Sequence, residues 1–297
     1  MLKKVLAVLC IVSLIFSLAA CGKPAEEKKI VVGGKEYTEQ DILVNIIAEV
    51  IENKTDIKVE RKSFLGGTQI CAQALESGDL DIYPEYTGTA LMSVLKEDRM
   101  NDPEAVYEKV KKRYEEEKNI IWLKPFGFNN TYALAMKESK AKELGIETYS
   151  DLVKHAPNLV FAGTQEYLER ADGYKGLKET YGMEFKSARS MDPGLTYTAV
   201  KDGKVDVNSA FATDGRIPAF NLKVLKDDKN FFPPYYAAPI IRKDTLEKYP
   251  ELEEVLNSLA GKIDDSTMAS LNSKVDIDKK DAKLVAKEWL KSEGFID

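Results

Sequence analysis

A unit of helix, glycine turn and strand occurs twice in this chain, and the repetition limits the folds available to it. Leu75 to Tyr86 (LESGDLDIYPEY) aligns without a gap to Val200 to Phe211 (VKDGKVDVNSAF). A second similarity, in the same order, pairs Ile30–Glu39 with Leu159–Arg170. Two such halves predict two similar α/β lobes that face one cleft. A chance similarity of short helix–glycine–strand units is the alternative.

The first copy predicts a ligand-facing loop. Apolar residues at helical spacing from Ile70 to Leu75 indicate a helix with Thr68 as its N-cap. Ser77–Asp79 ends that helix, and Leu80–Tyr83 alternates as a half-buried strand does. We expect Pro84–Thr89 to form the following loop, where α/β proteins usually place ligand contacts.

Other patterns place elements around this unit. A helix after Gly33-Gly34 is expected to start at Thr38, which forms a capping-box-like pair with Asp41. The loop before that helix puts Lys35 beside a helix N-terminus, which favours an anion such as a carboxylate, although a solvated lysine is the alternative. The remaining expected elements are strands at 57–63 and 120–123, crossings between lobes at 126–136 and 231–240, helices at 102–118 and 147–154, and helices at 252–259 and 283–291 that pack back on the first lobe.

The N-terminus has the pattern of an export signal. Lys3 and Lys4 precede an apolar run from Val5 to Leu18, and the run ends in Leu-Ala-Ala-Cys at Cys21. This ending looks like a bacterial lipobox. We therefore expect a lipoprotein signal peptide at 1–20, lipidation of Cys21 and a polar tether at 21–28. A plain secretory signal with a chance cysteine is the alternative.

Charge and motif content restrict the function. Residues 1–20 contain two lysines and no acidic residue, so without them the formal charge falls from −6 to −8, which disfavours nucleic-acid binding. The chain has one histidine, His155, and none of the common phosphate, dinucleotide, hydrolase, zinc or redox motifs. Cys71 lies on an apolar helix face, which favours the role of a small buried hydrophobic residue over that of a nucleophile. Isolated acids such as Glu85 and Asp214 could serve a secreted enzyme, but we expect no enzyme, no cofactor and no metal.

Seven motifs occur in order along the chain: GGKEYTEQ, LGGT, GDLDIYPEYTGT, NNTYALA, EYLERADGY, FATDGRI and FPPYYAAPI. With these motifs taken together, the chain resembles the substrate-binding lipoproteins of osmoprotectant ABC importers, which receive glycine betaine, carnitine and choline. The resemblance covers nearly the whole exported chain and implies a two-lobed α/β fold of the type II periplasmic-binding class, with the ligand cleft between the lobes.

The resemblance implies an aromatic box for a quaternary ammonium group. By position the box would consist of Tyr86, Tyr132, Phe211 and Tyr235, with Tyr236 as a possible substitute for Tyr235. Position 211 is usually Tyr in the relatives, so Phe211 keeps the ring face but lacks a hydroxyl. Ring faces suit a trimethylammonium group because it has no hydrogen-bond donor.

The resemblance also implies polar contacts to the rest of the ligand. Thr89 and Asn130 match positions near the ligand, and Lys35 and Arg170 match a pair that grips a betaine carboxylate in some members. Glycine betaine or carnitine is therefore favoured over choline. Ergothioneine, which also carries a trimethylammonium and a carboxylate, is the alternative ligand.

The implied mechanism is capture of a small molecule and its delivery. Lobe I (29–131 with 236–297) and lobe II (132–235) would close around the ligand by hinge motion. The closed form would dock on an ABC permease driven by a separate ATPase. The protein would be extracytoplasmic and held at the cell membrane by the lipid on Cys21.

Overall fold

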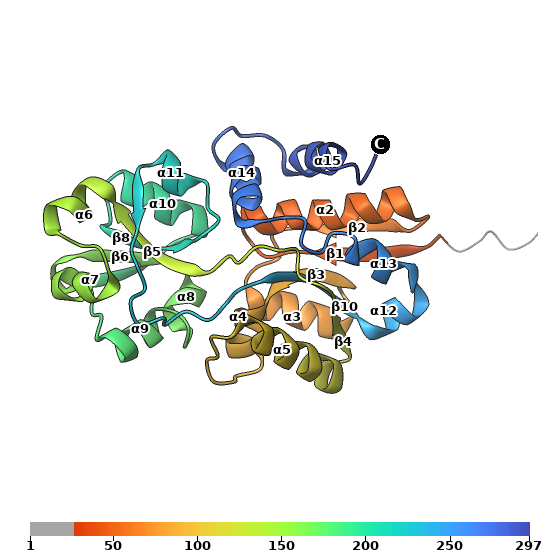
Figure 1. The fold of residues 1–297 in the computed structure, drawn as a ribbon, viewed down its shortest axis with the longest axis horizontal. Coiled ribbons are helices and arrows are strands. Elements are labelled where there is room, and N and C mark those ends of the chain that lie inside the picture. Colours follow the sequence, from red (N-terminus) through yellow and green to blue (C-terminus); the bar gives the residue numbers. More distant parts are fainter. Residues whose placement is uncertain (1–26) are drawn as a thin grey trace, which may run out of the picture.

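The computed structural model describes residues 27–297 and arranges them as two α/β lobes joined by extended crossings (Figure 1). The expected two-lobed α/β fold is confirmed. The expected signal peptide at 1–20, Cys21 and most of the tether lie outside the described residues.

The two sheets have the same topology. In each sheet three strands run parallel, and a fourth lies antiparallel between the third and an edge strand. The first sheet has the order β2-β1-β3-β10-β4 and the second the order β7-β6-β8-β5-β9. The first consists of β1 Lys29–Gly33, β2 Lys58–Lys62, β3 Ile82–Tyr86, β4 Ile120–Trp122 and β10 Ala237–Arg242. The second consists of β5 Tyr132–Lys137, β6 Val160–Gly163, β7 Ser187–Ser190, β8 Val207–Phe211 and β9 Leu222–Val224.

The repeated unit has the same local geometry in both lobes. Asp81 accepts a hydrogen bond from the Val31 amide at 2.7 Å, and Asp206 accepts one from the Val160 amide at 2.7 Å. Gly78 and Gly203 both lie in the left-handed region, with φ of 86° and 71°, which ends the helix before the strand. Each aspartate thus ties the start of one parallel strand to the strand that ends in the aromatic residue.

The antiparallel strand of each sheet arrives directly from the other lobe. Strand β5 follows the first crossing, and β10 follows the second. In register, Tyr132 of β5 lies opposite Phe211, and Ala237 of β10 lies opposite Tyr86. The crossings therefore bring the aromatic ends of β3 and β8 toward one cleft.

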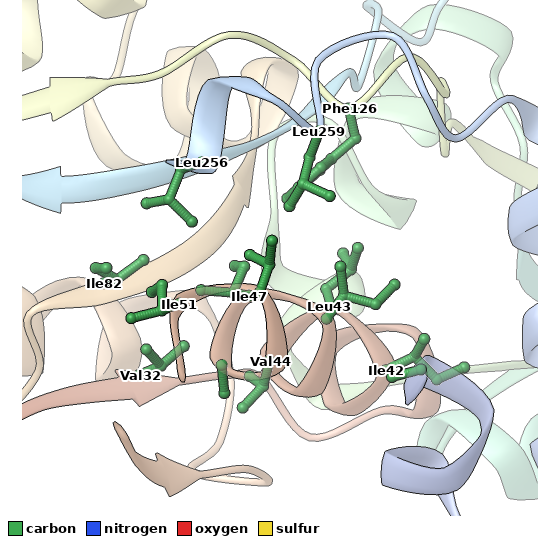
Figure 2. Packing of buried hydrophobic residues seen from close by; sticks show 14 of the residues in the cluster. Val32, Ile42, Leu43, Val44, Ile47, Ile51, Ile82, Phe126, Leu256 and Leu259 are labelled. Carbon is green, nitrogen blue, oxygen red and sulfur yellow. The ribbon is translucent and has the colours of Figure 1, made fainter. Parts of the chain in front are cut away.

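Helix α2 (Thr38–Lys54) forms the centre of the lobe I core. Its apolar side chains pack against the sheet and against helices from the C-terminal part of the chain. Figure 2 shows Leu43 and Ile47 on the side of α2 that faces Leu259. The prediction that the C-terminal helices pack back on the first lobe is confirmed. The other lobe I helices are α3 Thr68–Ser77, α4 Thr87–Thr89, α5 Pro103–Lys118, α12 Lys243–Lys248, α13 Glu251–Asn257, α14 Asp265–Asp276 and α15 Ala282–Ser292, with a π-helical turn at Ala90–Val94.

Lobe II is smaller and its helices are shorter. They are α6 Glu138–Leu144, α7 Tyr149–His155, α8 Gln165–Glu169, α9 Tyr174–Tyr181, α10 Pro193–Lys201 and α11 Arg216–Ala219, with a 3-10 turn at Ala156–Asn158. Aromatic residues fill much of its core, including Tyr149, Phe161 and Tyr167.

Three local predictions were wrong. The predicted loop Pro84–Thr89 is absent: Pro84, Glu85 and Tyr86 belong to strand β3, because β10 pairs with them from far along the chain, and Thr87–Thr89 form α4. Neither Thr38 nor Thr68 is an N-cap: the caps of α2 and α3 are Tyr37 and Gly67, without side-chain cap bonds. The Thr38 hydroxyl instead donates to Asp276 of α14 at 2.7 Å, a partner that local sequence does not reveal.

Candidate ligand-binding cleft

A pocket lies between the lobes at the carboxyl ends of β3 and β8. It encloses about 510 Å³ of empty space, including solvent at its mouth. The eight side chains named from the sequence all line it: Lys35, Tyr86, Thr89, Asn130, Tyr132, Arg170, Phe211 and Tyr235. The other lining residues are Glu36, Tyr37, Gly66, Gly67, Thr68, Thr164, Glu166 and Pro193.

Tyr132 is the centre of the aromatic wall. Its ring centroid lies 5.0 Å from that of Phe211 and 5.5 Å from that of Tyr235, the latter edge-on at 88°. Tyr235 lines the pocket and Tyr236 does not; the Tyr236 backbone is instead hydrogen-bonded to Thr87. Of the two alternatives left open by the sequence, the structure therefore brings Tyr235 to the pocket.

Tyr37 is an aromatic pocket residue that the sequence reasoning missed. Its ring stacks on Phe211 with centroids 5.3 Å apart and planes 12° apart. Tyr37 precedes α2 in lobe I, whereas Phe211 ends β8 in lobe II, so this stack joins the two lobes. The signal for it was present in the second internal similarity, where Tyr37 corresponds to Tyr167, itself packed against Tyr132 at 4.9 Å.

Arg170 is already engaged by the protein. Its Nε and Nη2 donate to the two oxygens of Asp172 at 2.7 and 2.5 Å, in the forked geometry typical of arginine–carboxylate pairs. Arg170 and Asp172 are only 7% and 1% exposed. Its Nη2 also donates to Thr89 at 3.3 Å, and its Nη1 donates to Glu166 at 3.0 Å. Arg170 thus faces the pocket as one member of a charged cluster that spans the cleft.

Lys35 is also paired. Its Nζ lies 2.6 Å from Oε1 of buried Glu85 and 5.2 Å from the centroid of the Tyr86 ring. Glu85 accepts a further bond from the Tyr83 hydroxyl at 3.0 Å. Both cations predicted to meet a ligand carboxylate therefore have a protein carboxylate beside them.

Glu166 crosses the cleft from lobe II to the start of α3. Its Oε2 accepts from the Thr68 amide at 3.3 Å, and a Cβ added at Gly67 would lie 2.5 Å from that oxygen. Burial raises the pKa of Glu166, but Arg170, Lys35 and the bonds from Thr68 outweigh burial and hold that pKa below its usual value. Glu166 is therefore an ionised acceptor at the edge of the pocket, and Gly67 leaves room for it.

Asn130 and Tyr86 both bond to a buried glutamate behind the pocket wall. The Asn130 Nδ2 donates to Oε1 of Glu39 at 2.8 Å, and the Tyr86 hydroxyl donates to the same oxygen at 2.7 Å. Gln40 donates to the Tyr86 hydroxyl at 3.1 Å. These bonds fix the orientation of the Tyr86 ring.

The histidine and the cysteine among the described residues do not line the pocket. Within residues 27–297, no cluster of His, Cys, Asp and Glu has the arrangement of a metal site. His155 ends α7 and does not line the pocket. Cys71 is buried, and burial raises the pKa of its thiol to about 12. Among the same residues, no helix is long and apolar enough to cross a membrane.

Comparison with known proteins gives consistent matches over nearly the whole described chain. Residues 28–292 match the model of the substrate-binding domain of the ABC-type glycine betaine transport system. The carnitine transport binding protein OpuCC of Listeria monocytogenes is 39% identical over 305 aligned positions, covering 100% of this chain and 99% of that protein. The ergothioneine transport permease/ergothioneine binding protein EgtU of Helicobacter pylori is 42% identical over 271 positions, which is 91% of this chain but 48% of that protein. This chain thus spans about half of the Helicobacter protein.

A solved structure agrees with these sequence matches. The crystal structure of a glycine betaine/carnitine/choline ABC transporter protein superposes with a TM-score of 0.74 at 35% identity. The superposition covers 92% of this chain and 100% of the chain in the crystal structure.

Proposed function

Since this chain belongs to the family of substrate-binding domains of ABC-type glycine betaine transport systems, we propose that its cleft captures one quaternary ammonium compatible solute and delivers it to a permease. The family consists of substrate-binding proteins of transporters and not of enzymes. The observation that carries the proposal is the group of aromatic rings around one pocket between the lobes.

The aromatic wall suits the cationic end of such a ligand. Tyr86, Tyr132, Phe211 and Tyr235 would surround the trimethylammonium group, and Tyr37 would close the wall beside Phe211. Each desolvated cation–π contact contributes about 0.5–2 kcal/mol. Four contacts would therefore supply much of the roughly 8 kcal/mol of a micromolar complex.

The charged cluster suits the other end of the ligand. Lys35 and Arg170 would attract a ligand carboxylate, with Thr89 and Asn130 as neighbouring polar contacts. Because Glu85 and Asp172 already compensate these cations, the carboxylate would add to existing ion pairs and not fill an empty positive site. Lys35 and Arg170 nevertheless line the pocket, so we favour glycine betaine and carnitine, with choline as a possible ligand of the same frame.

Ergothioneine is the second candidate, favoured by the 42% identity to the Helicobacter protein. It carries the same trimethylammonium and carboxylate together with a flat ring. The parallel pair of Tyr37 and Phe211 offers a flat apolar surface at one side of the pocket. This candidate uses the same cationic site, and ligand ranking separates it from glycine betaine and carnitine.

Capture would proceed by hinge closure of lobe I (29–131 with 236–297) on lobe II (132–235), followed by docking on an ABC permease with a separate ATPase. Proteins of this family are extracytoplasmic. A lipid anchor at Cys21, after removal of residues 1–20, would hold this one at the membrane. Labelled palmitate should enter the wild-type protein in cells and should not enter Cys21→Ala; equal labelling of both would contradict the anchor.

Calorimetric titration of the chain lacking residues 1–21 tests the proposed function. The ligands are glycine betaine, carnitine, choline, ergothioneine and proline. We expect saturable binding of at least one trimethylammonium compound, no binding of proline, and recovery of the ligand unchanged, as a receptor without turnover requires. Absence of heat with every trimethylammonium compound would contradict the proposal, and a converted ligand would indicate an enzyme.

A further inference from the structure

Glu39 is a buried carboxylate that does not line the pocket described above but lines a smaller cavity beside it, together with Asn130, Thr213 and Asn272. It is 3% exposed and accepts hydrogen bonds from four uncharged donors. Its Oε1 accepts from the Tyr86 hydroxyl at 2.7 Å and from Asn130 Nδ2 at 2.8 Å. Its Oε2 accepts from Asn272 Nδ2 at 2.9 Å and from the Thr213 hydroxyl. One oxygen therefore holds pocket residues, and the other holds residues outside the pocket.

The donors to Oε2 mark a contact between the lobes. Thr213 follows β8 in lobe II, whereas Asn272 belongs to α14 of lobe I, which Figure 1 shows at the end of lobe I that faces lobe II. Asn272 Nδ2 also donates to the Thr213 carbonyl at 3.0 Å. The segment 213–216 is thus bonded to α14 through the same residues that bond to Glu39.

Two further contacts strengthen this docking of 213–216 on α14. Arg216 forms an ion pair with Asp276 at 3.0 Å, and both side chains are largely buried. Gly215 lies so close to α14 that an added Cβ would come within 2.7 Å of Ser273 Cβ and 2.9 Å of its backbone nitrogen. The docking is therefore a tight contact that separation of the lobes would break.

The burial of Glu39 makes its bonds interdependent. A buried carboxylate is costly unless hydrogen bonds replace the lost water. Burial raises the pKa of Glu39, and the bonds from Thr213, Tyr86, Asn272 and Asn130 oppose that rise. When lobe II moves away from α14, Oε2 loses Thr213 and keeps only Asn272, so the buried charge is less fully compensated. We expect this loss to alter the bonds of Oε1 to Tyr86 and Asn130 as well.

We propose that Glu39 is a positioning residue for ligand capture, which couples the orientation of the Tyr86 ring to the docking of 213–216 on α14. The inference rests on the proposed function, in which Tyr86 is part of the aromatic wall. Docking then raises ligand affinity through a carboxylate that does not touch the ligand.

A double-mutant cycle on the full chain, purified in dodecyl maltoside, tests the coupling. Tyr86→Phe and Thr213→Val each remove one hydroxyl that bonds to Glu39 and retain the ring or the branched shape. We expect each variant to raise the Kd for the best betaine severalfold. The increase in Kd of the double variant should be smaller than the product of the two single increases by about threefold or more, because the effects of coupled residues are not additive in free energy. Effects that simply multiply would overturn the proposal.

Two controls separate coupling from general loosening. Thr245→Val removes a buried threonine hydroxyl that donates to Asp81 at 2.7 Å, away from the cleft. Its effect should multiply with that of Tyr86→Phe. In a Glu39→Gln background, the non-additivity between Tyr86→Phe and Thr213→Val should disappear; its persistence would show that another residue carries the coupling.

If the wild-type protein binds none of the betaines, the proposed function fails, and the same cycle is measured in the free energy of unfolding. Non-additivity there between Tyr86→Phe and Thr213→Val, absent with Thr245→Val, would retain the coupling through Glu39. Additive free energies would overturn it.

Discussion

Phe211 lies between two aromatic rings from different parts of the chain. Tyr37 stacks on it from lobe I, and Tyr132 packs beside it from the neighbouring strand. The phenyl ring therefore serves as a flat contact, and this role needs no hydroxyl.

Two substitutions at Phe211 distinguish the effect of removing the aromatic ring from the effect of adding a hydroxyl. Phe211→Leu should weaken binding of the best trimethylammonium ligand by about 0.5–2 kcal/mol, because it removes one ring face. Phe211→Tyr should bind within about threefold of the wild-type protein. Titration calorimetry gives both values, and a larger loss for Tyr than for Leu would contradict the ring-face role.

Arg170 combines a structural and a ligand-facing role in one side chain. Arg170→Ala leaves Asp172 buried without its cation, so we expect a loss of about 3–5 kcal/mol in the free energy of unfolding. Adding Asp172→Asn should restore part of that loss. Urea unfolding measures the stability of both variants. An Arg170→Ala protein as stable as the wild type would show that the pair is not needed.

The same variants test the preference for a carboxylate. In the Asp172→Asn background, Arg170→Ala should weaken glycine betaine or carnitine more than choline, because choline has no carboxylate. Equal losses for both kinds of ligand would contradict a role of Arg170 at the anionic end.

Among the helices and strands, the repeated helix–glycine–strand unit correctly predicted the two-lobed architecture. It did not reveal the contacts between segments that are distant in the sequence. The aspartates at 81 and 206 and the glycines at 78 and 203 indicated two equivalent strands, and both strands are present. Seven of the eight named site residues lie at or soon after strand ends or in the crossings, and Arg170 follows the short helix α8. Their assignment to ligand contacts stays a prediction.

The local sequence could not reveal side-chain interactions with residues that lie far along the chain. Thr38 reads as a cap, but its hydroxyl bonds to Asp276 in α14. Glu39 reads as a polar residue in a first turn, but its partners are spread from position 86 to position 272. The partners of Arg170 and Lys35 likewise emerged only from the folded arrangement, since Glu85 is distant in sequence and Asp172 was not recognised as a partner.

The contact of 213–216 with α14 can be tested by adding a methyl group at Gly215. Gly215→Ala places a Cβ against Ser273, while the glycine φ of −64° suits alanine without strain. We expect weaker ligand binding with little change in thermal stability. Gly145→Ala is the matched control: no atom lies near its added Cβ, but its φ of 66° is unfavourable, so it should lower stability and leave affinity unchanged. Unchanged affinity in Gly215→Ala would contradict a role of this contact in capture.

In the whole molecule, both lobes supply residues of the pocket. Lobe I contributes Tyr37 and Tyr86, lobe II contributes Tyr132 and Phe211, and the second crossing contributes Tyr235. Ring contacts between these parts would be completed only when the lobes meet. We therefore propose that the aromatic wall captures its ligand selectively as the two lobes close.

Calorimetric titration of Tyr132→Ala, Tyr132→Phe and the wild-type protein tests whether the aromatic wall recognises the ligand. Tyr132 packs against Phe211 and Tyr235 and occupies the centre of the wall. Tyr132→Ala should weaken binding of the best trimethylammonium ligand by about 1 kcal/mol or more, and Tyr132→Phe should stay within about threefold of the wild type. Equal affinity of Tyr132→Ala and the wild-type protein would contradict recognition by the aromatic wall.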